Sequence, residues 1–279
     1  MNVTESGFKN RQLHMEDYLQ MVSAEQKEYA EVFAHQRIAE NNDIITDFQT
    51  DNLMEQILHK DNLNKAYKKV KSNRGAGGID GMSVDELLGF LKDNQKQLVQ
   101  KIKDGKYKPN PVRRVEIPKE TKGEFRKLGV PTVVDRVFQQ AITQVLSQVF
   151  EKQFSENSFG FRPNRGAHDA LKQCQTNVNE GYVYVVDMDL EKFFDTVCQS
   201  KLIEVLSRTI KDGQVISLIH KYLNAGVISK GMFEKTEVGM PQGGPLSPLL
   251  SNIMLNELVL FGKLNAAFSV RLKRVFQST

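Results

Sequence analysis

The stretch from Tyr182 to Asp195, which reads YVYVVDMDLEKFFD, constrains the fold of this chain more than any other segment. Its first part, up to Leu190, is rich in β-branched and aromatic residues and predicts a buried or half-buried strand. Because side chains alternate along a strand, Asp187 and Asp189 would share one face of it. Two carboxylates at the end of an apolar strand suit a hard divalent cation, which would offset the cost of burying them. A strand that simply reaches the surface at its acidic end fits the pattern equally well.

Around this strand the sequence predicts mainly helices. The strongest pattern runs from Val134 to Phe150, where apolar residues recur at i, i+3 and i+4, as in a core helix. A capping box, in which Ser83 and Glu86 bond each other's backbone, predicts a helix that ends near Lys103. Other helices are predicted over residues 52–70, 167–178, 201–210 and 214–223 and after Ser247 as N-cap, and hairpins over residues 112–130 and 227–238. The mixture predicts an α+β chain with small antiparallel sheets.

The net charge of +4 is unevenly distributed along the chain. Residues 1–60 carry 5 basic and 11 acidic side chains, a net charge of −6, whereas residues 101–130 carry 10 basic and 4 acidic ones, a net charge of +6. The basic block covers the first predicted hairpin and predicts an anionic partner, most commonly nucleic acid. A solvated basic face is the alternative. The glycine-rich segment Asn73–Gly81 is predicted to be a loop, and a second loop, Ser158–Pro163, is expected to expose Arg162.

Several classes of protein are disfavoured. No apolar run is long enough to span a bilayer, and the N-terminus lacks the apolar core of a signal peptide, so the sequence predicts a cytoplasmic protein without a membrane partner. Cys174 and Cys198 fit neither a zinc knuckle nor a disulfide framework, and the histidines are scattered without ligand spacing. Residues 1–50 are predicted to be a partly ordered extension that contains a helix over Ala24–Ala39.

Taken together, motifs in a fixed order carry a family resemblance. They are IPK and RKLGVPTVVDR within residues 117–136, SFGFRP at 158–163, VVDMDLEKFFD at 185–195 and PQGGPLSP at 241–248. This order resembles the reverse transcriptase and maturase proteins encoded by bacterial group II introns. The resemblance implies a right-hand polymerase architecture with an incomplete palm. Residues 51–130 and 197–240 would form the fingers, and residues 131–196 and 241–257 a partial palm.

The resemblance also implies roles in nucleotide binding and catalysis. Asp189 would be the first catalytic aspartate and would bind Mg²⁺ together with the main-chain carbonyl of Leu190. Phe194 matches the bulky gate under the incoming sugar, and Gln242 matches the floor of the nucleotide pocket. The triphosphate would be neutralised by two fingers residues, Lys119 and Arg126.

For nucleic acid, the resemblance implies that the chain meets group II intron RNA, an RNA template paired with a DNA primer, and dNTPs. The Asn73–Gly81 loop matches the fingers insertion that holds template backbone and intron RNA. A homodimer is compatible with the sequence. The basic side chains expected to contact RNA are Arg74, Lys106, Lys108, Arg113, Arg114 and Arg162.

The chain departs from the family after Glu257. The family palm continues into a strand with a YADD motif, whose aspartates supply further metal ligands, whereas residues 258–279 contain neither aspartate nor glutamate. These residues are therefore expected to be a divergent basic tail, and the chain to be incomplete for catalysis alone. Two interpretations stay open: a reverse transcriptase/maturase that needs a missing piece, and a non-catalytic RNA-binding module or remnant of a decayed intron protein.

Overall fold

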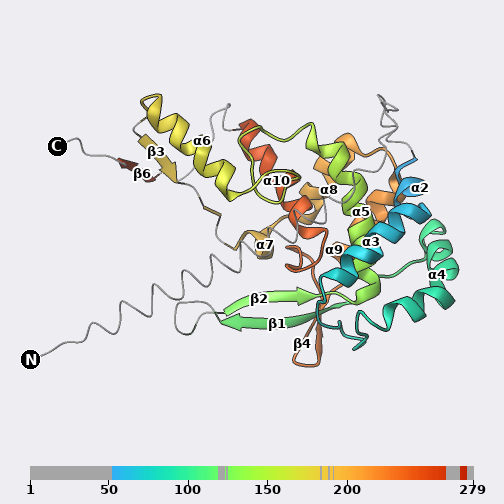
Figure 1. Cartoon of the computed structure of the whole chain (residues 1–279). Helices are drawn as coiled ribbons and strands as arrows, with labels where there is room; N and C mark the ends of the chain where they lie inside the picture. The colour runs from blue at the N-terminus through green and yellow to red at the C-terminus, as the bar shows by residue number, and fades with distance from the viewer. Residues whose placement is uncertain are drawn as a thin grey trace, which may run out of the picture. The chain divides into compact units, whose positions relative to one another are not determined.

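The computed structural model describes residues 52–118, 123, 125–182, 184–187, 189–190, 192–261 and 271–274. The predictions for residues 1–50, including the helix over Ala24–Ala39, and for Lys119 fall outside this part of the chain. Figure 1 shows the elements in order along the chain. They are α2 (Leu53–Leu58), α3 (Lys60–Ser72), α4 (Leu87–Lys103), β1 (Val112–Pro118), β2 (Phe125–Val130), α5 (Val133–Glu151), α6 (Ala167–Asn179), β3 (Tyr184–Asp187), α7 (Phe193–Thr196), α8 (Gln199–Thr209), α9 (Gly213–Leu223), β4 (Val227–Ser229), β5 (Met232–Glu234), α10 (Ser247–Phe261) and β6 (Arg271–Arg274).

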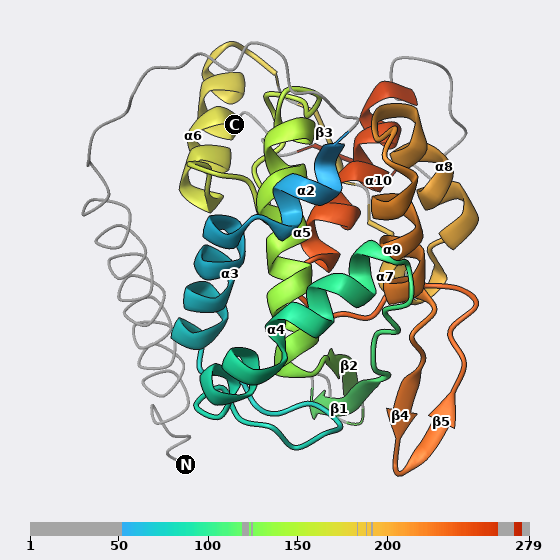
Figure 2. The same ribbon diagram turned by 90° about the vertical axis from the view of Figure 1, so that its right-hand side faces the viewer.

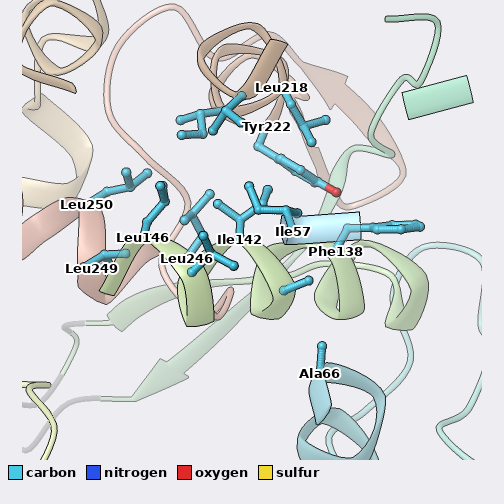
Figure 3. Packing of buried hydrophobic residues seen from close by; sticks show 14 of the residues in the cluster. Ile57, Ala66, Phe138, Ile142, Leu146, Leu218, Tyr222, Leu246, Leu249 and Leu250 are labelled. Atoms are coloured by element: carbon cyan, nitrogen blue, oxygen red, sulfur yellow. The ribbon is translucent and has the colours of Figure 1, made fainter. Parts of the chain in front are cut away.

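Helix α5 is the centre of the hydrophobic core, as its apolar period predicted. Helices α2, α3 and α10 pack against it, and Figure 2 shows it running between them. Apolar side chains meet α5 from more than one side, and Figure 3 shows Ala66 on the side of α5 opposite Leu218 and Tyr222. The labelled side chains are Ile57, Ala66, Phe138, Ile142, Leu146, Leu218, Tyr222, Leu246, Leu249 and Leu250. The core therefore joins segments predicted as fingers with segments predicted as palm.

Local capping signals set several helix ends. Asp212 caps α9 as its position suggests: its Oδ1 accepts from the backbone of Gln214 at 3.0 Å. The same carboxylate accepts from the backbone of Met54 at 2.8 Å and so joins α9 to α2. Ser83 and Glu86 form the predicted box, with the Ser83 backbone donating to Glu86 Oε2 at 2.8 Å, although the regular helix α4 begins only at Leu87.

The main sheet is mixed rather than antiparallel, with the strand order β2-β1-β4-β5. Strands β1 and β2 form the predicted antiparallel hairpin, as do β4 and β5. The two hairpins join through β1 and β4, which pair in parallel, with Val112 opposite Val227. Strand β5 ends at Glu234, earlier than predicted. Beyond it the chain turns toward α9, where the Thr236 hydroxyl donates to the Leu223 carbonyl at 2.8 Å. The α+β expectation is confirmed, and the strictly antiparallel pairing is wrong.

The strand that organises the sequence is shorter than predicted. Strand β3 covers only Tyr184–Asp187 and pairs antiparallel with β6, with Asp187 opposite Arg271. Only the four residues Tyr184–Asp187 pair with β6, so Asp189 lies beyond the end of the strand. Tyr182 and Tyr184, which share one face of the predicted strand, are 67% and 65% exposed, so a strand buried on both faces is excluded, whereas a half-buried strand is not. Helix α10 continues to Phe261, so the expected tail from residue 258 begins inside a helix.

Candidate functional site

The loop that contains the PQGG sequence is bound to the edge of β2. The backbone N–H of Gly129 donates to the carbonyl of Gln242 at 2.6 Å. Gly243 has a φ of +112°, and a Cβ there would lie 2.6 Å from the carbonyl oxygen of Gly129. Only glycine fits this conformation and this close approach. The loop therefore sets Gln242, which is half-buried, beside the strand that carries Arg126.

The other end of the same loop is bound to α7, which carries Phe194. The backbone N–H of Met240 donates to the Phe194 carbonyl at 2.7 Å, and that of Gly239 donates to the Val197 carbonyl at 2.8 Å. Gly239 has a φ of +80°, and a Cβ there would lie 2.7 Å from the Phe194 oxygen. Residues 239–243 therefore link the segments that carry Phe194, Gln242 and Arg126, which are far apart in the sequence.

Behind the loop lies a small cavity of about 30 Å³. Its lining includes the polar residues Asn110, Gln139, Tyr222 and Ser247. This volume holds about one water molecule, whereas small-molecule sites occupy hundreds of Å³. Helix α10 begins at Ser247, so this residue is the first of the helix rather than the predicted N-cap. Its hydroxyl donates to the Pro241 carbonyl at 2.6 Å and so holds the loop.

A buried carboxylate anchors the start of the β1–β2 hairpin to α5. Asp135 is 1% exposed, and its oxygens accept from the hydroxyls of Tyr107 and Thr132, both at 2.7 Å, and from the backbone of Asn110 at 3.1 Å. Burial raises the pKa of Asp135, while these hydrogen bonds act in the opposite direction. The Tyr222 hydroxyl is buried nearby without a hydrogen-bond partner among the described residues, and burial raises the pKa of Tyr222.

The segment that carries Asp189 is far more open. Asp189 is exposed, and its Oδ1 accepts from the Leu190 backbone at 2.9 Å. Leu190 itself is 39% exposed. Within the described ranges, no group of three or more His, Cys, Asp or Glu residues lies close enough together to hold a metal ion. The described residues therefore do not form a complete metal site around Asp189.

The basic residues predicted to contact RNA have different surroundings. Arg74, Lys106 and Lys108 are exposed. Arg113 donates through Nη2 to the Gly77 carbonyl at 2.9 Å, and Arg114 pairs with Glu234 at 3.1 Å. The guanidinium groups of both arginines thus already have partners within the protein.

Arg162 corrects the sequence-based expectation of an exposed arginine. It is 8% exposed, and its Nη2 donates to Glu151 at 2.7 Å, while Nη1 donates to the carbonyl of Ser158 at 2.9 Å. A carboxylate at the end of α5 and loop carbonyls take up its donors, so the side chain holds its own loop together. Phe161 of the same loop is 83% exposed.

Sequence reasoning did not single out Asp135, Arg136 or Gln139, which lie on the buried surface of α5. Arg136 is 9% exposed and donates to the Ala76 carbonyl in the glycine-rich loop. The sequence did contain a signal for them, because Asp135 and Arg136 are adjacent charged residues in the first turn of a predicted core helix. Charged residues are buried only where they have partners, so this pair could have indicated a buried polar contact.

Comparisons with known proteins agree with the motifs. A family model described as "Reverse transcriptase (RNA-dependent DNA polymerase)" matches residues 117–271, past Glu257 where the motif resemblance ends. The group II intron-encoded protein LtrA of Lactococcus lactis subsp. cremoris is 38% identical over 226 residues, which are 81% of this chain and 37% of LtrA. Protein YkfC of Escherichia coli K12 is 36% identical over 74% of this chain and 55% of its own length.

The fold also has a likeness among solved structures. A chain of the "Partial Cas6-RT-Cas1--Cas2 complex" matches with a TM-score of 0.51 and 22% identity, over 74% of this chain and 34% of that one. This likeness concerns the fold alone. Across all these matches the chain spans between about a third and about half of the length of its relatives. Separately, no helix in the described part of the chain has the length and apolar character to cross a membrane.

Proposed function

Since the chain belongs to the reverse transcriptase (RNA-dependent DNA polymerase) family and is homologous to group II intron-encoded proteins, we propose that it forms the fingers and first palm segment of such a reverse transcriptase/maturase. In this role it binds an RNA template with its DNA primer, an incoming dNTP and group II intron RNA. The observation that carries the proposal is the loop 239–243, which is bound to β2 at one end and to α7 at the other.

This arrangement supports a nucleotide-binding role for residues that the sequence separates. Phe194 is half-buried next to Phe193, with ring centroids 5.4 Å apart, and supplies a firm wall for the sugar. Gln242 supplies the floor from the loop bound to β2. Arg126 is exposed on the same strand, where a planar guanidinium suits a triphosphate. Lys119, which follows β1 in the sequence and lies outside the described residues, is proposed to assist Arg126.

Reverse transcriptases use a divalent metal, and we propose Mg²⁺ with Asp189 and the carbonyl of Leu190 among its ligands. One exposed carboxylate binds such an ion weakly, because Mg²⁺ sites usually combine carboxylates with phosphates and water. This chain by itself is consequently expected to bind template and primer without extending the primer. Extension then requires carboxylates beyond the described residues.

The proposal is tested with a fluorescein-labelled poly(rA)/oligo(dT) duplex. Binding should be measurable at physiological salt and should weaken steeply as salt rises, since the basic hairpin releases counterions from phosphates. Adding dTTP with Mg²⁺ should tighten the complex, and Phe194→Ala should remove most of this gain. A native chain that does not bind the duplex refutes the proposed function, and Asp189-dependent extension by the chain alone refutes the expected incompleteness.

The second candidate is a non-catalytic RNA-binding module. The openness of the Asp189 segment favours it. Such a module binds RNA with the same salt dependence, but it has no nucleotide site and should therefore respond equally to all dNTPs. Equal binding in the presence of dTTP and of the mismatched dGTP would therefore favour the module, whereas tightening by dTTP alone would favour the polymerase fragment.

A further inference from the structure

The glycine-rich loop Asn73–Gly81 rests on two arginines from two different elements. Arg113 of β1 donates through Nε at 3.3 Å and Nη2 at 2.9 Å to the carbonyl of Gly77. Arg136, in the first turn of α5, donates through Nη2 to the carbonyl of the preceding residue, Ala76. Two consecutive loop carbonyls are thus bound by guanidinium groups held in a strand and a core helix.

Glycines allow the loop to lie against these elements. A Cβ at Gly75 would be 2.5 Å from Nη1 of Arg136. A Cβ at Gly78 would be 2.6 Å from the Cα of Thr132, which caps α5. Both approaches are closer than real Cβ contacts, so side chains at these positions would push the loop away from α5 or displace Arg136. Packing against α5 therefore accounts for the glycines at positions 75 and 78.

The electrostatics of Arg136 do not favour a purely stabilising role. Burial lowers its pKa, nearby Asp80 raises it, and the like charge of Arg113 lowers it again. Its Nε is buried without a hydrogen-bond partner among the described residues. An apolar side chain of similar volume would avoid this desolvation. What arginine provides and an apolar side chain lacks is a set of N–H donors in a fixed geometry, one of which binds the Ala76 carbonyl.

We propose that Arg136, assisted by Arg113, is a positioning residue that holds the Asn73–Gly81 loop so that Arg74 meets the RNA backbone. Arg74 is exposed and has a φ of +44°, a conformation that a non-glycine residue keeps only where its surroundings impose it. This inference rests on the proposed RNA-binding function. It changes the role of Arg113 from a direct phosphate contact to a support of the loop.

Gly75→Ala is the most direct test, because it displaces the Arg136 guanidinium without removing a charge. We expect it to weaken binding of the fluorescein-labelled poly(rA)/oligo(dT) duplex about fivefold and to lower the salt slope by about 1, as does Arg74→Ala. Arg136→Met should have the same effect. The double variant Gly75→Ala/Arg74→Ala should bind no more weakly than Arg74→Ala alone, since both changes remove one contact. Gly89→Ala is the control, because a Cβ there meets nothing within 4 Å.

Two outcomes overturn the inference. If Arg136→Met and Arg74→Ala weaken binding additively, Arg136 contacts RNA independently of Arg74. If Gly75→Ala leaves binding unchanged, the contact of Arg136 with the Ala76 carbonyl does not position the loop.

Hydrogen exchange separates this inference from the proposed function because it needs no RNA. In the free protein, Gly75→Ala should speed exchange of the amides in residues 74–81 while those of α3 and α5 keep their native rates. Unchanged loop exchange overturns the inference whether or not the native chain binds the duplex.

Discussion

The two ends of the candidate site differ in how the chain supports them. At the nucleotide end, glycines at 129, 239 and 243 let β2, the loop and α7 approach one another closely, and a buried aspartate ties the hairpin to the core helix. At the carboxylate end, Asp189 follows a strand of four residues and is exposed. The described residues thus hold the proposed nucleotide-binding segments more firmly than they hold Asp189, the proposed metal ligand.

The largest loss of stability should come from a change in the loop 239–243, which β2 and α7 hold in place. Gly243→Ala forces a side chain into a φ of +112° and against the carbonyl of Gly129. We expect a loss of roughly 4 kcal/mol in the free energy of unfolding, measured by urea denaturation, together with loss of the tightening by dTTP. Gly160→Ala is the matched control, because a Cβ there has no neighbour within 4 Å. Equal stability of the two variants would contradict the close docking of the loop on β2.

The buried carboxylate should have the next largest effect. Asp135→Ala leaves the hydroxyls of Tyr107 and Thr132 without their acceptor, which should cost about 3 kcal/mol in urea denaturation. Asp135→Asn keeps an oxygen acceptor and should cost less. A cost within about 0.5 kcal/mol for the alanine variant would show that the hydroxyls find other partners.

The same residue predicts a direction of pH dependence. Because burial raises the pKa of Asp135, the folded state holds its proton at pH values where the unfolded state has released it. Its contribution to stability is therefore complete below the unfolded pKa, about 3.9, and is lost as the pH rises through the folded pKa. Asp135→Asn should flatten this decline. A decline of equal slope in both proteins would assign it to other groups.

The sequence predicted what local pattern and short-range signals determine. The apolar period located α5, and the capping box of Ser83 and Glu86 forms as predicted. Motif order predicted the family, which the comparisons support. These features depend on residues a few positions apart, so they can be read without knowledge of the tertiary structure.

The failures share the opposite cause, which is dependence on distant residues. The parallel pairing of β1 with β4 joins segments more than a hundred positions apart. Arg162 is buried because Glu151, at the end of α5, lies within reach of its loop. Arg136 was not singled out because its partner, the Ala76 carbonyl in the glycine-rich loop, lies 60 positions earlier in the sequence. Asp189 fell outside its strand because the pairing of β3 stops at Asp187.

The smallest effect on stability is expected at the open end. Asp189→Asn should change the free energy of unfolding by less than about 0.5 kcal/mol, because the described contact of this exposed side chain is with its neighbouring backbone. If Asp189 binds Mg²⁺ in this chain, titration of Mg²⁺ into the complex of protein, poly(rA)/oligo(dT) and dTTP should tighten the native complex and leave the Asn variant unchanged. Asp195→Asn is a matched control, since this aspartate is also exposed and lies in α7. A destabilisation by Asp189→Asn as large as that of Asp135→Ala would show that the carboxylate end is as firmly built as the nucleotide end, and the contrast between them would fall.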